Sequence, residues 1–236
     1  MKRFYREVGL AEAAQHDGSP GWRVLLDGRP IRTQAGREQV LPTRALAEAL
    51  ADEWRGQGNE IDSGRFVLRD MADHAIDTIA PNPARAAAAL LAYGETDTLL
   101  YRADPDEPLS LAQRAAWDPL VEAAEARHGV TFRRVAGVMH KPQPDATLPL
   151  MLGKIASLDC FSLAALANLA SLAASLIVGL AALEPGADAA ALFDTANLEE
   201  DWQAERWGED AEAAERRGLR KAAFIAAARF AALVRD

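Results

Sequence analysis

Four side chains that could bind a metal ion recur at helical spacing between residues 70 and 77. Asp70, Asp73, His74 and Asp77 stand at positions i, i+3, i+4 and i+7, so a helix would place them on one face. Three carboxylates and one imidazole are suitable ligands for a divalent cation. A solvated polar face explains the same pattern, however, and no second cluster of ligands accompanies it. We therefore predict neither a metal site nor a cofactor.

The only cysteine, Cys160, would need a neighbouring base to act as a nucleophile. It opens an apolar stretch with no histidine close in the sequence, so we interpret it as a buried structural thiol. His140 lies in a Gly-Val-Met-His-Lys-Pro segment and is interpreted as a loop histidine rather than a general base. The sequence contains no glycine-rich phosphate loop and neither of the motifs G-x-S-x-G and H-E-x-x-H. These patterns predict no catalytic site.

Two tryptophans stand among carboxylates in residues 198–210, which we expect to be helical. Tryptophan favours burial and carboxylates favour water, so a surface that carries both is typical of a binding site. We predict that five residues contact a partner: Glu199, Glu200, Trp202, Glu205 and Trp207. Trp202 and Glu205 share one face of such a helix while Glu200 and Trp207 share another, so all five cannot contact one flat surface. Some of them must be structural.

A second cluster combines tyrosines with carboxylates in residues 93–101. Gly94 is expected to end a helix in the left-handed conformation, so that Glu95 and Asp97 follow it beside Tyr93 and Tyr101. In one interpretation, Tyr93, Glu95 and Asp97 bind a partner. In the other, residue 96 or 97 caps the next helix and both rings pack inward with their hydroxyls hydrogen-bonded. The sequence leaves both interpretations open.

Composition and charge narrow the classes of partner. Half of the 236 residues are apolar and 26% are charged, which is typical of a soluble globular protein. The net charge of −9 would repel polyanions, so we expect neither nucleic acid nor an anionic membrane as partner. A single cysteine cannot form an internal disulfide, which fits a reducing compartment. The N-terminus shows no signal or transit pattern, so the protein is expected to stay where it is made.

Residues 160–183 contain no charged side chain and are long enough to cross a bilayer. We favour a single buried helix, because much of the run is Ala and Ser, and no Trp/Tyr belt or Lys/Arg bias marks its ends. Its leucines recur every three to four residues with small residues between them, as in a central helix packed on all sides. We predict no stable membrane insertion, and a membrane-tethered adaptor remains a third interpretation.

The first 62 residues indicate a β-rich domain with one helix. Asp27-Gly28 separates two short runs at 22–26 and 29–33, which is the strongest local signal for a β-hairpin. Further strands are expected at 4–10 and 38–41. Thr43 is expected to cap a helix that ends near Arg55, with Trp54 anchored in the core.

Helical spacing dominates beyond residue 62. We expect helices over 68–79, 84–93, 109–127, 143–155 and 160–183, another from 188, a last one over 209–234, and a strand at 130–135. Gly129 should close the 109–127 helix, in which Trp117 is expected to be a core residue. The fold class is therefore α+β, with a small N-terminal β-rich domain at 1–62 and a larger, mainly α-helical domain at 63–236.

Several of these runs together resemble one family, the assembly chaperones of the ATP synthase F-one sector that bind its alpha subunit. The likeness covers nearly the whole chain, and the order and spacing of the runs are more specific than any one of them. The matching runs are Ala92–Asp97, Leu100–Arg102, Ala116–Leu120, Leu198–Gln203 and Arg206–Gly208, together with Arg3–Tyr5, Leu26–Thr33, Leu41–Ala47 and Glu53–Trp54 near the N-terminus.

The resemblance implies a chaperone that holds the unassembled alpha subunit until a beta subunit replaces it, with no catalytic step. The lack of a transit pattern at the N-terminus indicates a bacterial, cytoplasmic member, with the mitochondrial matrix as the compartment of eukaryotic relatives; we expect a monomer. In this role Trp202 and Trp207 would anchor the client or brace the helix, and Glu199, Glu200 and Glu205 would pair with client arginines. The alternative function is a small-molecule enzyme that uses the carboxylate patches for acid–base chemistry.

The sequence departs from the family pattern at three places. Ala173-Ala174-Ser175 stands where the family often has Ser-Gly-Ser, Asn168 stands where a histidine is expected, and His74 replaces a small polar residue. These departures leave Asn168 without an assigned role and weaken the case for a metal at His74.

Overall fold

The computed structural model describes residues 1–15, 17–208 and 210–235. The chain divides into two compact units, each assembled from separate parts of the sequence. The first contains Met1–Pro83, Asp159–Ala165 and Arg229–Asp236, and the second contains Ala84–Leu158 and Leu166–Ala228. The residues that follow 62 pack on the helix before it, and the predicted domain boundary after residue 62 stays a prediction.

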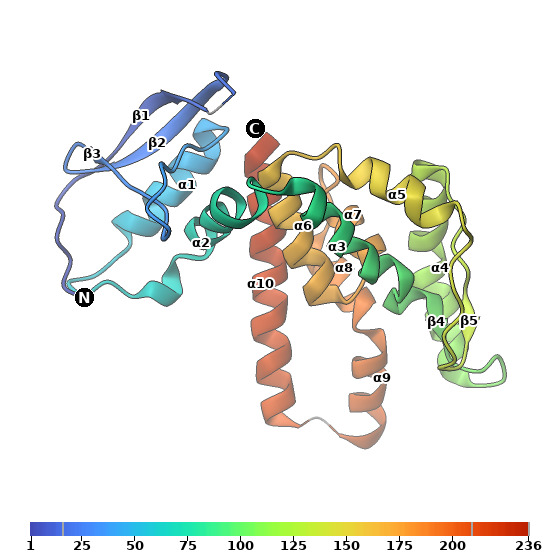
Figure 1. Ribbon diagram of the computed structural model, residues 1–236. Helices are drawn as coiled ribbons and strands as arrows, with labels where there is room; N and C mark the ends of the chain where they lie inside the picture. The colour runs from blue at the N-terminus through green and yellow to red at the C-terminus, as the bar shows by residue number, and fades with distance from the viewer. Residues whose placement is uncertain (16, 209, 236) are drawn as a thin grey trace. The chain divides into compact units, whose positions relative to one another are not determined.

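A three-stranded antiparallel sheet belongs to the first unit (Figure 1). Asp27 and Gly28 join its second and third strands with φ values of 48° and 79°, as a two-residue hairpin turn requires. The predicted hairpin is therefore confirmed. The strand predicted at 4–10 is displaced, because pairing begins at Val8 and continues to Ala14. The strands are β1 (Val8–Ala14), β2 (Pro20–Leu26) and β3 (Arg29–Pro30), in that order across the sheet.

Helix α1 (Arg44–Arg55) packs on β1 and β2 through a fully buried apolar face that includes Leu46 and Leu50. Its N-terminus is capped as predicted, because the Thr43 hydroxyl accepts a hydrogen bond from the Leu46 amide at 3.1 Å. The same hydroxyl donates to the carbonyl of Leu233 near the C-terminus. One side chain therefore fixes the start of α1 and ties the last residues of the chain to the first unit.

Trp54, near the end of α1, contacts segments that precede and follow this helix. Its ring centroid lies 4.4 Å from that of Phe66, and its carbonyl accepts a hydrogen bond from the Tyr5 hydroxyl at 2.6 Å. Glu53 beside it accepts from the Leu68 amide at 2.7 Å. The segments packed in this way are η1 (Ser63–Arg65), α2 (Val67–His74) and η2 (Ala75–Ile79), a π-helical turn that continues α2.

The second unit is mainly helical (Figure 1). A short parallel pair, β4 with β5, is the only strand pairing in the part of this unit that the structure describes. The α+β class is confirmed. Helices α6 and α10, which lie beyond residue 83, have residues in both units. The elements of this part of the chain are α3 (Pro83–Glu95), η3 (Thr98–Leu100), β4 (Tyr101–Arg102), α4 (Pro108–His128), β5 (Val135–Ala136), α5 (Thr147–Ile155), α6 (Cys160–Ala173), α7 (Leu176–Ala182), α8 (Ala189–Ala196), α9 (Leu198–Trp207) and α10 (Ala211–Arg235).

The uncharged run at 160–183 does not form the single helix that was predicted. It is divided into α6 and α7 by Ala174, which has φ of 48°, and by Ser175, whose hydroxyl caps α7 by accepting from the Val178 amide at 3.0 Å. The carbonyl of Ala174 in turn accepts hydrogen bonds from both the amide and the hydroxyl of Thr98, at 3.1 and 2.9 Å. Among the described residues, no helix combines the length and apolarity needed to span a membrane.

Two glycines show how helix ends depend on context. Gly129 ends α4 in the left-handed conformation with φ of 67°, as predicted. The same prediction for Gly94 is wrong, because α3 continues through it to Glu95. A Cβ atom at Gly94 would lie 3.0 Å from Cδ2 of Leu176, so its lack of a side chain lets α3 approach α7 closely. The predicted start of the last helix at Glu209 lies outside the described residues.

Candidate functional site

Helices α9 and α10 lie side by side and carry complementary charges (Figure 1). The Asp201 carboxylate pairs with Arg217 at 2.8 Å, and Glu200 pairs with Arg220 at 3.0 Å. Arg217 also contacts Asp194 of α8 at 3.0 Å. These side chains are partly exposed, so each pair contributes about 0–1 kcal/mol. Together these ion pairs orient α9. One of them engages Glu200, a carboxylate that was predicted to contact a partner.

Glu199 is directed into the unit rather than to a partner. Its Oε1 accepts a hydrogen bond from Nε2 of Gln113, a fully buried side chain of α4, at 2.5 Å. Gln113 Oε1 accepts in turn from the amide of Ala103 at 2.8 Å. These two hydrogen bonds link α9 to α4 through Glu199. Breaking them would leave buried polar groups unpaired, which is costly.

The C-terminal half of α9 presents the exposed members of the predicted set. Trp207 is 78% exposed, a high value for so large an apolar side chain. Glu205 is also exposed, and its carboxylate has no ion-pair partner among the described residues. Trp202 is half-buried, with the Arg206 guanidinium 4.5 Å from its ring centroid. Apolar surface and unpaired charge therefore occur together at the end of α9.

The tyrosine–carboxylate cluster is held together by His140. Its Nδ1 lies 3.0 Å from the Tyr101 hydroxyl, and its Nε2 lies 3.4 Å from Oε1 of Glu95. Tyr93 and Glu95 are half-buried. The loop that carries His140 also exposes Val138 and Met139, whose side chains are 94% and 75% accessible. Polar contacts therefore bring this loop to the end of α3.

Asp97 is fully buried and serves the fold instead of a surface. Its Oδ1 accepts from the Leu99 amide at 3.0 Å, and its Oδ2 accepts from the Ile177 amide at 2.9 Å. It thereby caps η3 and satisfies an amide at the start of α7. Burial raises the pKa of this carboxyl to about 6, although the hydrogen bonds from Ile177, Ser175 and Leu99 act in the opposite direction.

Trp117 is fully buried within α4, and its Nε1 donates to the Thr195 carbonyl at 2.7 Å. The hydrogen bond joins α4 to α8, which precedes α9. Trp117 thus helps to position α8, which leads into α9 and its candidate surface.

The carboxylates at 70–77 accept hydrogen bonds from a loop of the same unit. Asp73 is buried and accepts from Nε2 of Gln39 at 2.6 Å and from the Gln34 amide at 3.1 Å. Asp77 accepts from the Thr33 hydroxyl at 2.8 Å. Among the described residues, no group of three or more His, Cys, Asp or Glu side chains is arranged for a metal ion.

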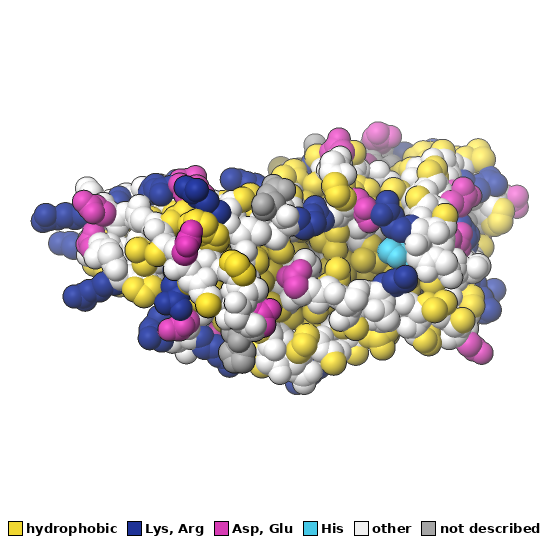
Figure 2. Space-filling model, turned by 90° about the horizontal axis from the view of Figure 1, so that it is seen from above, with side chains coloured by type: hydrophobic (Ala, Val, Ile, Leu, Met, Phe, Trp, Pro, Cys, Tyr) yellow, Lys and Arg dark blue, Asp and Glu magenta, His cyan; other side chains and the backbone are white. Residues whose placement is uncertain are grey.

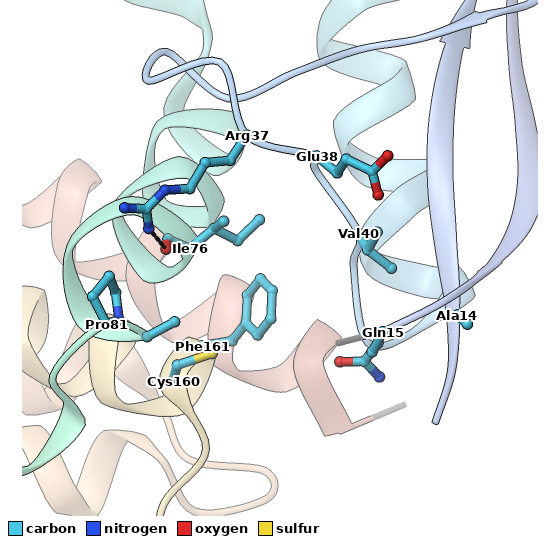
Figure 3. Close-up of a pocket in the computed structure, with 10 residues that line it drawn as sticks. Ala14, Gln15, Arg37, Glu38, Val40, Ile76, Pro81, Cys160 and Phe161 are labelled. Carbon is cyan, nitrogen blue, oxygen red and sulfur yellow. Dashed lines mark hydrogen bonds between the residues drawn. The ribbon is translucent and has the colours of Figure 1, made fainter. Parts of the chain in front are cut away.

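A cavity in the first unit has a volume of about 780 Å³ (Figure 3). Figure 3 shows Cys160 and Phe161 on one side of it and Arg37 donating to the carbonyl of Ile76, a bond of 3.0 Å. Burial raises the pKa of the Cys160 thiol, with a smaller contribution from Asp159. The thiol is therefore kept protonated at neutral pH, which disfavours a role as nucleophile.

The surface is mixed in charge. Figure 2 shows Lys and Arg side chains interspersed with Asp and Glu side chains on the face in view. Such a surface favours recognition by local complementarity over attraction to a polyanion.

Sequence reasoning found the acidic residues of α9 but did not pair them with the basic residues of α10. Arg217, Arg220 and Lys221 stand at positions i, i+3 and i+4, and this spacing predicts a basic stripe on α10. That stripe could have been matched to the acids of α8 and α9, since a short connection favours antiparallel neighbours.

Three comparisons place the chain among known proteins. The family model for the ATP12 chaperone protein matches residues 2–125, more than half of the chain. A solved structure of a mutant of P. denitrificans Atp12p is 40% identical, covers 99% of this chain and 97% of that chain, and superposes with a TM-score of 0.92. A crystal structure of Atp12 from Paracoccus denitrificans is also 40% identical, covers 99% and 98%, and has the same TM-score of 0.92.

A relative with a mitochondrial name is more distant. Protein atp12, mitochondrial, of Schizosaccharomyces pombe is 26% identical over 197 residues, which are 78% of this chain and 68% of that protein. Proteins of this family are chaperones of ATP synthase assembly and not enzymes, so the acid–base enzyme considered from the sequence is set aside. By the match of the family model and the likeness of the solved structures, the chain belongs to the ATP12 chaperone family.

Proposed function

We propose that this chain binds the unassembled alpha subunit of ATP synthase and covers its interface until a beta subunit replaces the chaperone. The alpha subunit is the client that the sequence resemblance implies. A subunit that awaits its partners exposes apolar area that would otherwise aggregate. A reversible holder needs an interface of moderate size with a polar rim.

The observation that carries the proposal is the exposure of Trp207 at the end of α9. Ion pairs to α10 and a hydrogen bond to α4 hold the other side of this helix. Tryptophan is the residue most enriched among binding hot spots. Here 78% of the side chain is accessible. Glu205, on another face of the same helix, is exposed and has no ion-pair partner among the described residues. Because the ion pairs to α10 and the Glu199–Gln113 bond already orient α9, little ordering would be needed on binding.

We divide the predicted contact residues into two groups according to what each side chain contacts within the chain. Trp207, Glu205 and the half-buried Trp202 are available to a client, and Glu200 is available in part because it also pairs with Arg220. Tyr93 and Glu95 are proposed as a second, separate contact. We assign Glu199 and Asp97 to internal roles, since their oxygens are used within the unit. We further propose a monomer that acts in the bacterial cytoplasm.

Two matched pairs of variants test this surface. Trp207→Ala should weaken alpha-subunit binding by about thirtyfold, the effect of losing a hot spot, while Leu111→Ala removes another apolar side chain, 63% exposed, from α4. Glu205→Lys reverses an unpaired charge on α9, and Glu215→Lys reverses an exposed one on α10. The readouts are calorimetric binding and light scattering of refolding alpha subunit.

We expect both α9 variants to lose binding with little change in melting temperature, and both controls to behave as the unmodified protein does. If Trp207→Ala and Glu205→Lys bind normally, the end of α9 is not the docking surface. If the unmodified protein itself neither binds the alpha subunit nor keeps it in solution, the proposed client is wrong.

A further inference from the structure

A small cavity in the second unit lies between the β4–β5 pair and the first half of α4. Its volume is about 250 Å³. On α4, Ser110, Arg114 and Asp118 recur every four residues and so share one helix face that lines it. Arg102 of β4 and Arg134, which precedes β5, line it as well. Three arginines and one aspartate therefore line one cavity.

Arg102 is the most constrained of these side chains. It is 9% exposed, and its guanidinium lies 5.0 Å from the ring centroid of the buried Trp117. Its Nη2 donates to Oδ1 of Asp118 at 2.8 Å, whereas its Nε and Nη1 are buried and have no hydrogen-bond partner among the residues that the structure describes. Unpaired donors on a buried cation are costly, so such groups in a native protein call for a partner.

The other charges leave the cavity positive. Arg134 is balanced by Glu125, to which it donates two hydrogen bonds of 2.8 and 3.2 Å. Asp118 is shared, at 2.8 Å from Arg102 and 4.0 Å from Arg134. The Arg114 side chain has no ion pair or hydrogen bond within the described part of the chain. Burial lowers the pKa of Arg102, but a guanidinium remains protonated at neutral pH.

We propose that this cavity binds a small oxyanionic group, either a phosphoryl or a carboxylate group. Arg102 provides a fixed buried charge against Trp117, and Arg114 at the rim provides a second charge that is free to close on the anion. The hydroxyl-bearing Ser110, 5% exposed, lies in the same wall. Guanidinium groups suit both kinds of anion, because their donors match the geometry of phosphate and carboxylate oxygens.

The size of the cavity sets the class of ligand. Sites for whole cofactors or drug-sized molecules usually measure about 300–1,000 Å³. A cavity of about 250 Å³ suits a free anion or the charged end of a larger molecule. The site is distinct from the exposed end of α9, and the inference does not rest on the proposed client.

The test titrates the full-length protein with sodium phosphate and, separately, with sodium acetate at a constant ionic strength set by NaCl. Binding is followed by calorimetry and by the melting temperature. Arg114→Gln removes the rim charge, which has no partner to lose within the described ranges. Arg133→Gln is the matched control, since Arg133 is exposed and its side chain likewise has no partner in those ranges, but it does not line the cavity.

We expect saturable binding of at least one anion by the unmodified protein and by Arg133→Gln, and an affinity at least about tenfold lower in Arg114→Gln. Saturation by phosphate alone would assign a phosphoryl group, and saturation by acetate alone would assign a carboxylate. The absence of saturable binding of both anions would overturn the proposal. Equal affinity in Arg114→Gln and the control would also overturn it. Binding to the alpha subunit is not a readout, so either proposal can fail without the other.

Discussion

Replacing Asp97 by asparagine isolates the contribution of one buried carboxyl to the pH dependence of folding. This carboxyl has an ordinary pKa of 3.8 that rises to about 6 in the folded protein, with burial as the main cause. One pKa unit corresponds to about 1.4 kcal/mol, so the rise corresponds to about 3 kcal/mol in the free energy of unfolding.

The sign follows from proton binding. Between pH 3.8 and about 6, Asp97 is protonated in a larger fraction of folded than of unfolded molecules. Protonation of Asp97 therefore stabilises the fold fully below pH 3.8, and this stabilisation is lost as the pH rises to about 6. Asparagine does not titrate, so the stability of the unmodified protein relative to Asp97→Asn should fall by about 3 kcal/mol across this window.

Urea unfolding at several pH values between 4 and 7 measures this difference, and subtraction removes the contributions of the other titrating groups. Asp104→Asn, on an exposed turn of the same unit, controls for the loss of one carboxyl. Asparagine cannot accept from both the Leu99 and the Ile177 amides, so Asp97→Asn carries a constant offset as well. A difference that stays flat with pH, or that grows in favour of the unmodified protein as the pH rises, would refute the reasoning.

Two further substitutions test the backbone assignments. Ala174→Gly should raise the free energy of unfolding by about 0.5–1 kcal/mol, because alanine at φ of 48° is strained and this exposed position leaves no cavity; a destabilised variant in urea would contradict the strain. Thr43→Ala should lower the melting temperature through a loss of about 1 kcal/mol or more, since it removes both the cap on Leu46 and the bond to Leu233; an unchanged melting temperature would show that neither bond contributes.

Local signals made part of the fold predictable. Asp27-Gly28, the Thr43 cap and Gly129 each act within a few residues, so the sequence was sufficient to place the turn and two helix ends. The division between α6 and α7 was not predictable in the same way. It depends on Thr98, distant in sequence, which donates twice to the Ala174 carbonyl, and alanine is not a residue that signals a left-handed position.

The candidate surface could be predicted in composition but not in orientation. Helical spacing indicated that the five predicted residues of 199–207 could not all contact one flat surface, but it did not indicate which of them were structural. Glu199 is internal only because the buried Gln113 of α4 lies opposite it. Internal hydrogen-bond partners such as Gln113 are set by tertiary packing, and the periodicity of one helix cannot predict them.

The first unit is completed by residues from the far end of the chain. The Thr43 hydroxyl donates to the Leu233 carbonyl, and the rings of Phe161 and Phe230 lie 6.4 Å apart within the same unit. Ribosomal synthesis is directional, so the β-rich part emerges long before the residues that finish its core. A nonsense codon near residue 229 would therefore damage the part of the molecule made first, although it deletes only what is made last.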